Sequence, residues 1–181
     1  MLAAARDAFL ETGYGAATIV DIARRAGVGV STVYAVLGSK RGILAALGES
    51  WSMDSGRREL LREAETEEDL PTRLETAAHA IRREWETGAD AVAVLESAAS
   101  ADRAAARQLE GASTERARAY APLVASLGPR LRAGLDPAAA FAIFSALSRA
   151  ELYRELVGRH GWNPDRYEAW LAATLAQQLL G

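Results

Sequence analysis

The amino-acid sequence predicts an all-α protein, and three observations favour that fold class. Alanine, leucine, arginine and glutamate, which are good helix formers, are abundant along the chain. No stretch shows the alternation of β-branched and polar residues that is typical of strands. Capping residues and glycines divide the chain into about nine helices. The expected architecture is an N-terminal three-helix helix-turn-helix domain followed by a larger helical domain.

Each expected helix has a start or stop signal in the sequence. Thr18 is an N-cap, with Asp21 three residues later as in a capping box, and Gly27 supplies a left-handed stop. Pro137 and Pro164 each follow a capping residue, which is typical of a first helical turn. The helices are expected at about residues 2–11, 19–26, 30–37, 39–57, 70–87, 89–100, 102–133, 136–157 and 164–180.

A polar stretch and two prolines interrupt this pattern of helices. The polar, acidic stretch at residues 63–69 predicts a connection before the later helices. Pro122 and Pro129 predict a kink or a split in the helix after Asp102. We therefore expect a domain boundary near residue 48, with residues 1–48 as the helix-turn-helix domain and residues 49–181 as the helical body.

Composition excludes several classes of protein. The chain has 181 residues, no cysteine and a net charge of −3. Without cysteine there are no disulfides and no thiolate metal sites, so a cytoplasmic location is expected. No run of apolar residues is long enough for a membrane span, and the N-terminus does not resemble a secretory signal. Residues 1–48 carry a charge of +2 on an otherwise acidic chain, which favours contact with a polyanion at that end.

The helix at residues 30–37 is the candidate DNA-reading element. At about 1.5 Å per residue its length suits a major groove about 12 Å wide. Val33 and Leu37 face inward at i,i+4 spacing, so the hydroxyl groups of Thr32 and Tyr34 are free to meet phosphate oxygens. Lys40 lies at the start of the next helix, where the free backbone amides also favour an anion. The other expected DNA contacts are Val30, Ser31 and Ala35.

These residues are similar to the N-terminal domain of the tetracycline-repressor (TetR/AcrR) family of bacterial transcriptional regulators. The resemblance rests on Thr18, residues 21–23, residues 26–28, residues 32–34, and residues 39–40 followed by Leu44. It implies that Thr32, Tyr34 and Lys40 contact the DNA backbone, with Val30, Ser31 and Ala35 nearest the bases. Gly29 replaces the usual capping serine, residues 35–37 directly after Tyr34 contain no aromatic residue or histidine, and the basic arm that precedes the first helix in the family is not in this sequence.

The resemblance also implies that the body binds a small-molecule effector. Small apolar residues on the helices near residues 89–100 and 136–150, with bulky residues on neighbouring segments, are consistent with an aromatic-lined pocket. The alternative is that these residues fill an ordinary core, and for any one residue that alternative is favoured. The candidate ligand-binding residues are Trp51, His79, Trp85, Leu95, Tyr120 and Phe141.

The last two expected helices are candidates for a homodimer interface. Alanines recur at i, i+3, i+4 and i+7, which allows close approach of another helix, and an apolar face lies on the preceding helix. Packing of the same stripe within one chain is the alternative. The candidate interface residues are Phe144, Leu147, Ala169, Ala172, Ala173 and Ala176.

The sequence does not predict an enzyme. It contains no zinc-protease motif, phosphate-binding glycine loop or nucleophile elbow. Glu75 and His79 have a spacing that can begin a metal site, but no further ligands are evident, so no metal or cofactor is expected.

The leading hypothesis is a homodimeric repressor that binds palindromic DNA and is released by an effector. The alternative is a helical small-molecule-binding or interaction module without DNA binding.

Overall fold

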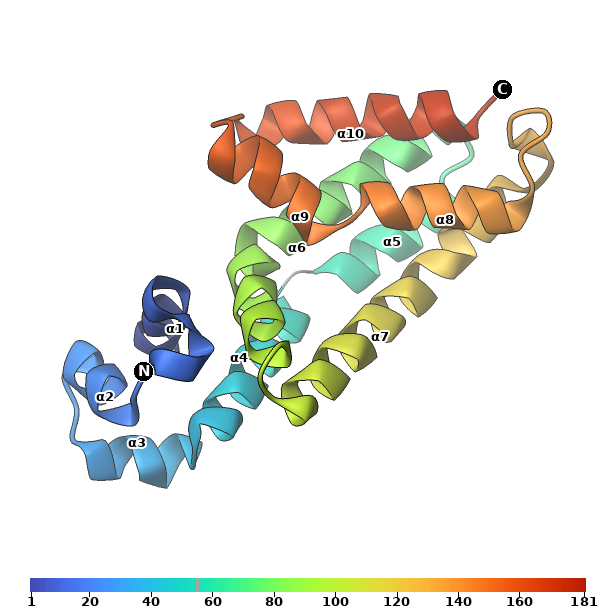
Figure 1. Cartoon of the computed structure of the whole chain (residues 1–181). Coiled ribbons are helices and arrows are strands. Elements are labelled where there is room, and N and C mark those ends of the chain that lie inside the picture. Colours follow the sequence, from blue (N-terminus) through green and yellow to red (C-terminus); the bar gives the residue numbers. More distant parts are fainter. Residues whose placement is uncertain (55) are drawn as a thin grey trace. The chain divides into compact units, whose positions relative to one another are not determined.

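The computed structural model describes residues 1–54 and 56–181, with only the backbone described for residues 50–54. Apart from an isolated β-bridge between Leu131 and Leu180, its regular structure over these residues is helical (Figure 1). This confirms the all-α prediction. The α-helices are α1 (Leu2–Ala16), α2 (Ile19–Ala26), α3 (Val30–Leu37), α4 (Lys40–Asp54), α5 (Arg57–Thr66), α6 (Leu70–Ala99), α7 (Arg103–Leu127), α8 (Pro137–Leu147), α9 (Ala150–Tyr153) and α10 (Pro164–Leu179). A 3₁₀ turn, η1 (Gly128–Arg130), follows α7, and a π-helical turn, η2 (Arg154–Arg159), follows α9.

Several boundaries differ from the prediction. Helix α1 continues to Ala16 where an end near residue 11 was expected, and the helix expected at residues 136–157 is divided into α8, α9 and η2. Helix α5 lies partly within the polar stretch at residues 63–69 and was not expected, because only Leu61 and Ala64 of this helix are buried. Helix α6 is continuous where a break near residue 88 was expected. Helix α7 continues through Pro122 and ends in η1, so the predicted interruption occurs only near Pro129.

The chain forms two compact units. Unit 1 contains Met1–Asp54 and Asp90–Ser113, and unit 2 contains Ser55–Ala89 and Thr114–Gly181. Helices α6 and α7 each have one end in unit 1 and the other end in unit 2. Unit 1 therefore includes a segment that the expected boundary near residue 48 assigns to the body.

The core of unit 1 joins the N-terminal helices to the ends of α6 and α7. Phe9, Ile22 and Val33 are each at most 1% exposed and come from α1, α2 and α3. Leu95 on α6 and Ala105 on α7 belong to the same buried cluster. Burial of these apolar side chains is what fixes α3 against its neighbours.

The core of unit 2 is rich in aromatic rings. The ring centroids of Tyr120 and Phe144 lie 5.2 Å apart, and those of Tyr153 and Tyr167 lie 5.0 Å apart, both in edge-on geometry. Helices α8 and α10 pack side by side in this unit (Figure 1). Over the residues that the structure describes, no helix has the length and apolarity that crossing a membrane requires.

Candidate functional site

Local signals in the sequence set the positions of α2 and α3. The Thr18 hydroxyl oxygen accepts a hydrogen bond from the Asp21 backbone N–H at 3.1 Å and donates one to the Asp21 carboxylate at 2.8 Å. Gly27 ends α2 with φ 66° and ψ 30°, a left-handed conformation that suits glycine. The predicted cap and stop are therefore present. They leave a tight turn between α2 and α3, as in a helix-turn-helix motif.

Helix α3 buries one edge and exposes the rest. Val33 is 1% exposed within the core of unit 1, and Leu37 is partly buried against it. The other six residues are exposed, including all five α3 residues that were predicted to contact DNA. Tyr34 is 54% exposed, and Val36, which was not predicted, is 60% exposed. Burying the Val33 edge presents the opposite face of α3 to solvent.

Lys40 is held by the end of α1. Its ammonium donates to the carbonyl oxygen of Tyr14 at 2.5 Å and to that of Gly15 at 3.2 Å, and it lies 4.7 Å from the centre of the Tyr14 ring. Partial burial lowers the pKa of Lys40. The lysine thus ties the first turn of α4 to α1, in addition to the phosphate contact that the sequence predicts for it.

The start of α4 approaches α3 closely. A Cβ atom at Gly42 would lie 2.0 Å from the carbonyl oxygen of Leu37, so a larger residue at this position requires α3 or α4 to shift. Arg41 extends from the same turn and donates to the Asp102 carboxylate at 2.6 Å, which lowers the pKa of Asp102. The position of α3 relative to α4 and α7 is therefore set within unit 1.

The basic side chains of residues 1–48 are engaged inside unit 1. Arg6 pairs with the adjacent Asp7, Arg24 lies 3.6 Å from Asp21, and Arg25 pairs with Glu11 at 2.6 Å. Because Arg41 pairs with Asp102, which lies outside residues 1–48, the charge of +2 counted for this segment is partly compensated, whereas Lys40 donates to neutral carbonyls and keeps its charge. The predicted basic surface is accordingly weaker than the charge count indicates.

The predicted ligand-binding residues do not form one cluster. Leu95 is fully buried in the core of unit 1, apart from the other candidates, and its ligand contact stays a prediction. The Trp51 side chain lies outside the described residues. His79 lies 2.9 Å from Glu168 of α10, and Phe141 is partly exposed on α8. Among the six candidates, the structure leaves Trp85 and Tyr120 together in the buried interior of unit 2.

Those two aromatic residues accompany a buried carboxylate that the sequence reasoning missed. Glu84 is 0% exposed and accepts hydrogen bonds from Arg57 at 2.5 Å and from the Tyr120 hydroxyl at 2.6 Å. The neighbouring Trp85 donates its indole N–H to the carbonyl oxygen of Ser148 at 2.9 Å. Burial and the adjacent carboxylate raise the pKa of Tyr120 well above its usual value, so its phenol is a stable donor to Glu84.

A second buried phenol lies in the same unit. The Tyr167 hydroxyl is buried and has no hydrogen-bond partner among the described residues. Burial raises the pKa of Tyr167, and the charge of Glu84 adds to this shift.

The sequence spacing contained a signal that Glu84 is buried, because this residue continues the apolar stripe of Ala77 and Ile81 on α6. The charged residues next to Glu84 in the sequence favoured an exposed position instead.

The predicted dimer residues divide between core and surface. Phe144 is fully buried against Tyr120 in its own chain and is not on the exposed face of α8, and its place in a subunit interface stays a prediction. Ala169 and Ala173 are exposed, and Ala172 is 8% exposed. Leu147 and Ala176 are partly buried. A surface strip of alanines on α10 thus remains available.

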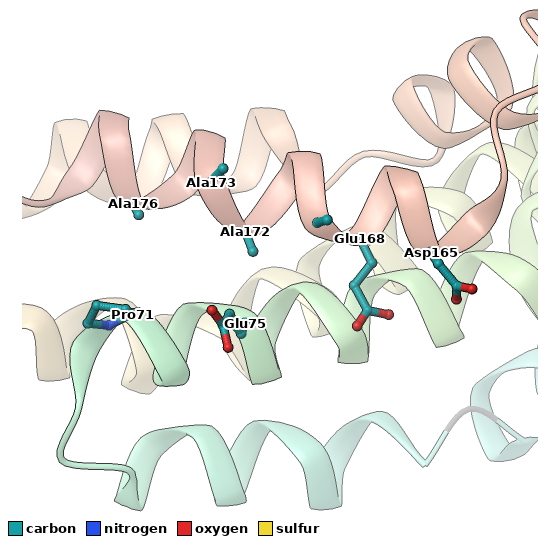
Figure 2. Close-up of a pocket in the computed structure, with 8 residues that line it drawn as sticks. Pro71, Glu75, Asp165, Glu168, Ala172, Ala173 and Ala176 are labelled. Atoms are coloured by element: carbon teal, nitrogen blue, oxygen red, sulfur yellow. The ribbon is translucent and has the colours of Figure 1, made fainter.

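This alanine strip lines a groove between α6 and α10 with a volume of about 350 Å³ (Figure 2). Pro71 and Glu75 contribute from α6, and Asp165 and Glu168 contribute acidic groups from α10. Glu168 reaches toward α6 (Figure 2), where Arg82 donates to it at 3.2 Å. The groove therefore has a floor of small apolar residues and an acidic end.

The fold and the site define a helix-turn-helix protein with a larger helical C-terminal domain. Residues 1–47 match the family described as bacterial regulatory proteins, tetR family. The whole chain has a TetR-like fold, with an N-terminal helix-turn-helix and a larger helical C-terminal domain. No curated protein sequence matches the chain.

Three solved structures illustrate the similarity of fold. The SmeT–triclosan complex has a TM-score of 0.74 at 18% identity, over 99% of this chain and 90% of that one. The TetR family transcriptional regulator PfmR from Thermus thermophilus has a TM-score of 0.67 at 20% identity, over 98% and 96%. FadR from Bacillus subtilis in complex with stearoyl-CoA has a TM-score of 0.72 at 15% identity, over 96% and 95%.

Proposed function

We propose that this protein is a ligand-responsive repressor that binds palindromic DNA as a homodimer and is released by a small-molecule effector. The observation that carries the proposal is the exposed face of α3, where hydroxyl and aliphatic side chains stand outside a buried edge. A helix presented in this way is how helix-turn-helix proteins enter the major groove. Residues 1–48 are the proposed DNA-binding domain, and a cytoplasmic location follows from that role.

The proposed contacts divide by chemistry. Thr32, Tyr34 and Lys40 contact phosphates, because hydroxyl and ammonium groups donate to phosphate oxygens. Val30, Ser31 and Ala35 lie nearest the base edges. Only one N–H of the Lys40 ammonium is needed for a phosphate, and two of its three hydrogens serve the carbonyls of α1.

The proposed dimer uses α8 and α10. Exposed Ala169 and Ala173 permit close packing of a helix from a second subunit, with Leu147 and Ala176 at the edges. A twofold dimer places two copies of α3 about 34–36 Å apart, in successive major grooves of a palindrome. The second subunit supplies base contacts that one short helix lacks.

The proposed effector site lies in unit 2. Trp85 and Tyr120, with the buried Glu84 carboxylate, supply aromatic surface and hydrogen-bonding groups in one place. The unpaired hydroxyl of Tyr167 adds a further polar group for a ligand. The complexes of structurally similar proteins with triclosan and with stearoyl-CoA support this role for the domain. An effector acts by binding the state with lower DNA affinity more tightly.

The proposal is tested by fluorescence anisotropy with DNA recovered by selection from a random pool. Salt-sensitive, sequence-selective binding is expected, and Tyr34→Phe is expected to weaken binding to every sequence by a similar factor because it removes a phosphate contact. Leu10→Ala, which removes an exposed side chain of α1, is the control. Equal affinity for all DNA sequences, with no change in Tyr34→Phe, would contradict the proposal.

A second candidate function is a helical small-molecule-binding or interaction module without DNA binding. The observation that favours it is the internal pairing of the basic residues in residues 1–48. Paired charges attract DNA less strongly than free ones. The same titration separates the two functions, because this module binds no DNA selectively at micromolar protein concentration.

A further inference from the structure

The exposed surface of α3 has a regular composition. Residues four apart on a helix lie on one side of it, so α3 carries one buried row, Val33–Leu37, and three exposed rows. Each exposed row pairs one hydroxyl-bearing side chain with one aliphatic side chain. These rows are Val30–Tyr34, Ser31–Ala35 and Thr32–Val36.

This surface lacks the side chains that read bases through paired hydrogen bonds. Arginine, lysine, asparagine, glutamine, aspartate and glutamate are all missing from the eight residues of α3. Arginine with guanine and asparagine or glutamine with adenine are the bidentate pairings of the major groove. The helix must therefore distinguish bases mainly by other means.

The aliphatic side chains provide such a means. Val36 is 60% exposed and Val30 is 37% exposed, and both are among the most exposed large apolar residues that the structure describes. The C5-methyl group of thymine is the apolar group that bases display in the major groove. A helix that brings alkyl groups into this groove gains free energy where they cover a methyl group.

We propose that α3 selects its DNA through the C5-methyl groups of thymine, which Val36, Val30 and Ala35 contact. The proposal rests on the DNA-binding function proposed above and defines the chemistry of the sequences that are bound. It adds Val36 to the base-reading residues. The hydroxyl groups of Thr32 and Tyr34 hold the helix against the DNA backbone, while the alkyl groups contact the methyl groups of the bases.

Replacement of thymine by uracil tests this directly, because it removes only the methyl group and keeps the base pair. Each thymine of the selected half-site is replaced in turn, and affinity is measured by anisotropy. Loss of one contacted methyl, at about 0.8 kcal/mol for a buried methyl-sized group, corresponds to about a fourfold loss of affinity. Uracil placed outside the half-sites is the control duplex and is expected to change nothing.

A variant protein identifies the residue responsible. With Val36→Ala, the ratio of affinities for the thymine and uracil duplexes is expected to fall toward one at the position that Val36 contacts. Leu10→Ala removes an exposed aliphatic side chain from α1 of the same unit and is expected to keep the wild-type ratio. Circular dichroism of both variants checks that the helices remain.

The outcomes separate this inference from the proposed function. Selective binding with equal affinity for thymine and uracil duplexes at every position would overturn the role of methyl groups, as would a selected half-site without thymine. Absence of any sequence-selective binding would instead overturn the DNA-binding function itself. A preference for thymine of about fourfold that Val36→Ala removes would establish the inference.

Discussion

Lys40 offers the sharpest test of how the reading helix is held. In Lys40→Met the aliphatic stem remains, but the hydrogen bonds to the carbonyl oxygens of Tyr14 and Gly15 are lost, together with the charge over the Tyr14 ring. A hydrogen bond to a charged group contributes about 1.5–3 kcal/mol. Water can replace the ammonium at these partly exposed carbonyls, so the net loss of folding free energy is expected to be about 2 kcal/mol for the pair.

The assay is urea unfolding of the full chain, followed by circular dichroism. Arg24→Met is the matched control, because Arg24 is 71% exposed and lies 3.6 Å from its partner, and a surface pair of this kind contributes about 0–1 kcal/mol. Equal midpoints for Lys40→Met and the wild type would refute the role of Lys40 in holding α1 to α4.

The same variant tests the proposed phosphate contact. Removal of one phosphate contact lowers the dependence of log affinity on log salt by about 0.9 per subunit. We expect weaker binding to all DNA sequences and this smaller slope. Lower stability with an unchanged slope would mean that Lys40 acts through α1 alone.

The remaining predictions concern both units. Tyr120→Phe is expected to cost about 1–2 kcal/mol in thermal unfolding, because it leaves one lone pair of the buried Glu84 carboxylate without its donor; an unchanged Tm would count against this. Ala173→Glu is expected to shift the protein toward monomer in sedimentation equilibrium, since a charge would enter the proposed helix contact, and an unaltered dimer would exclude this face. The pKa of Asp102 is lowered mainly by its hydrogen bond with Arg41. Its stabilising contribution is therefore present above the unfolded-state pKa and is lost as the pH falls through the lower folded-state value. Asp102→Asn should consequently lose less stability than the wild type as the pH falls below the unfolded-state pKa of about 4, and identical acid unfolding curves would contradict the pairing.

The features that sequence predicted well depend on neighbouring residues. Thr18 caps α2 because its hydroxyl oxygen needs only the backbone N–H of Asp21, three residues further along the chain. Gly27 ends α2 because the chain takes a left-handed backbone conformation there, which glycine adopts readily. The exposed face of α3 followed from the i,i+4 spacing of Val33 and Leu37. Local spacing therefore sufficed to place the candidate DNA-reading surface.

The features that it did not reveal depend on distant packing. Leu95 was assigned to a pocket in the body, but the end of α6 packs into unit 1, which no local pattern indicates. Phe144 has the apolar character of an interface residue, yet the fold places Tyr120 against it. Glu84 has charged neighbours in sequence, which favour an exposed position, whereas Arg57 and Tyr120 reach it from other helices.

The measurement that tests the central claim most directly is a titration of the selected palindromic duplex and of a scrambled duplex across a series of salt concentrations. Two subunits that each place α3 in a major groove should prefer the palindrome at every salt concentration, with affinity falling as salt rises. Equal affinity for the two duplexes, or the absence of binding at micromolar protein, would contradict the assignment of α3 as a DNA-reading helix.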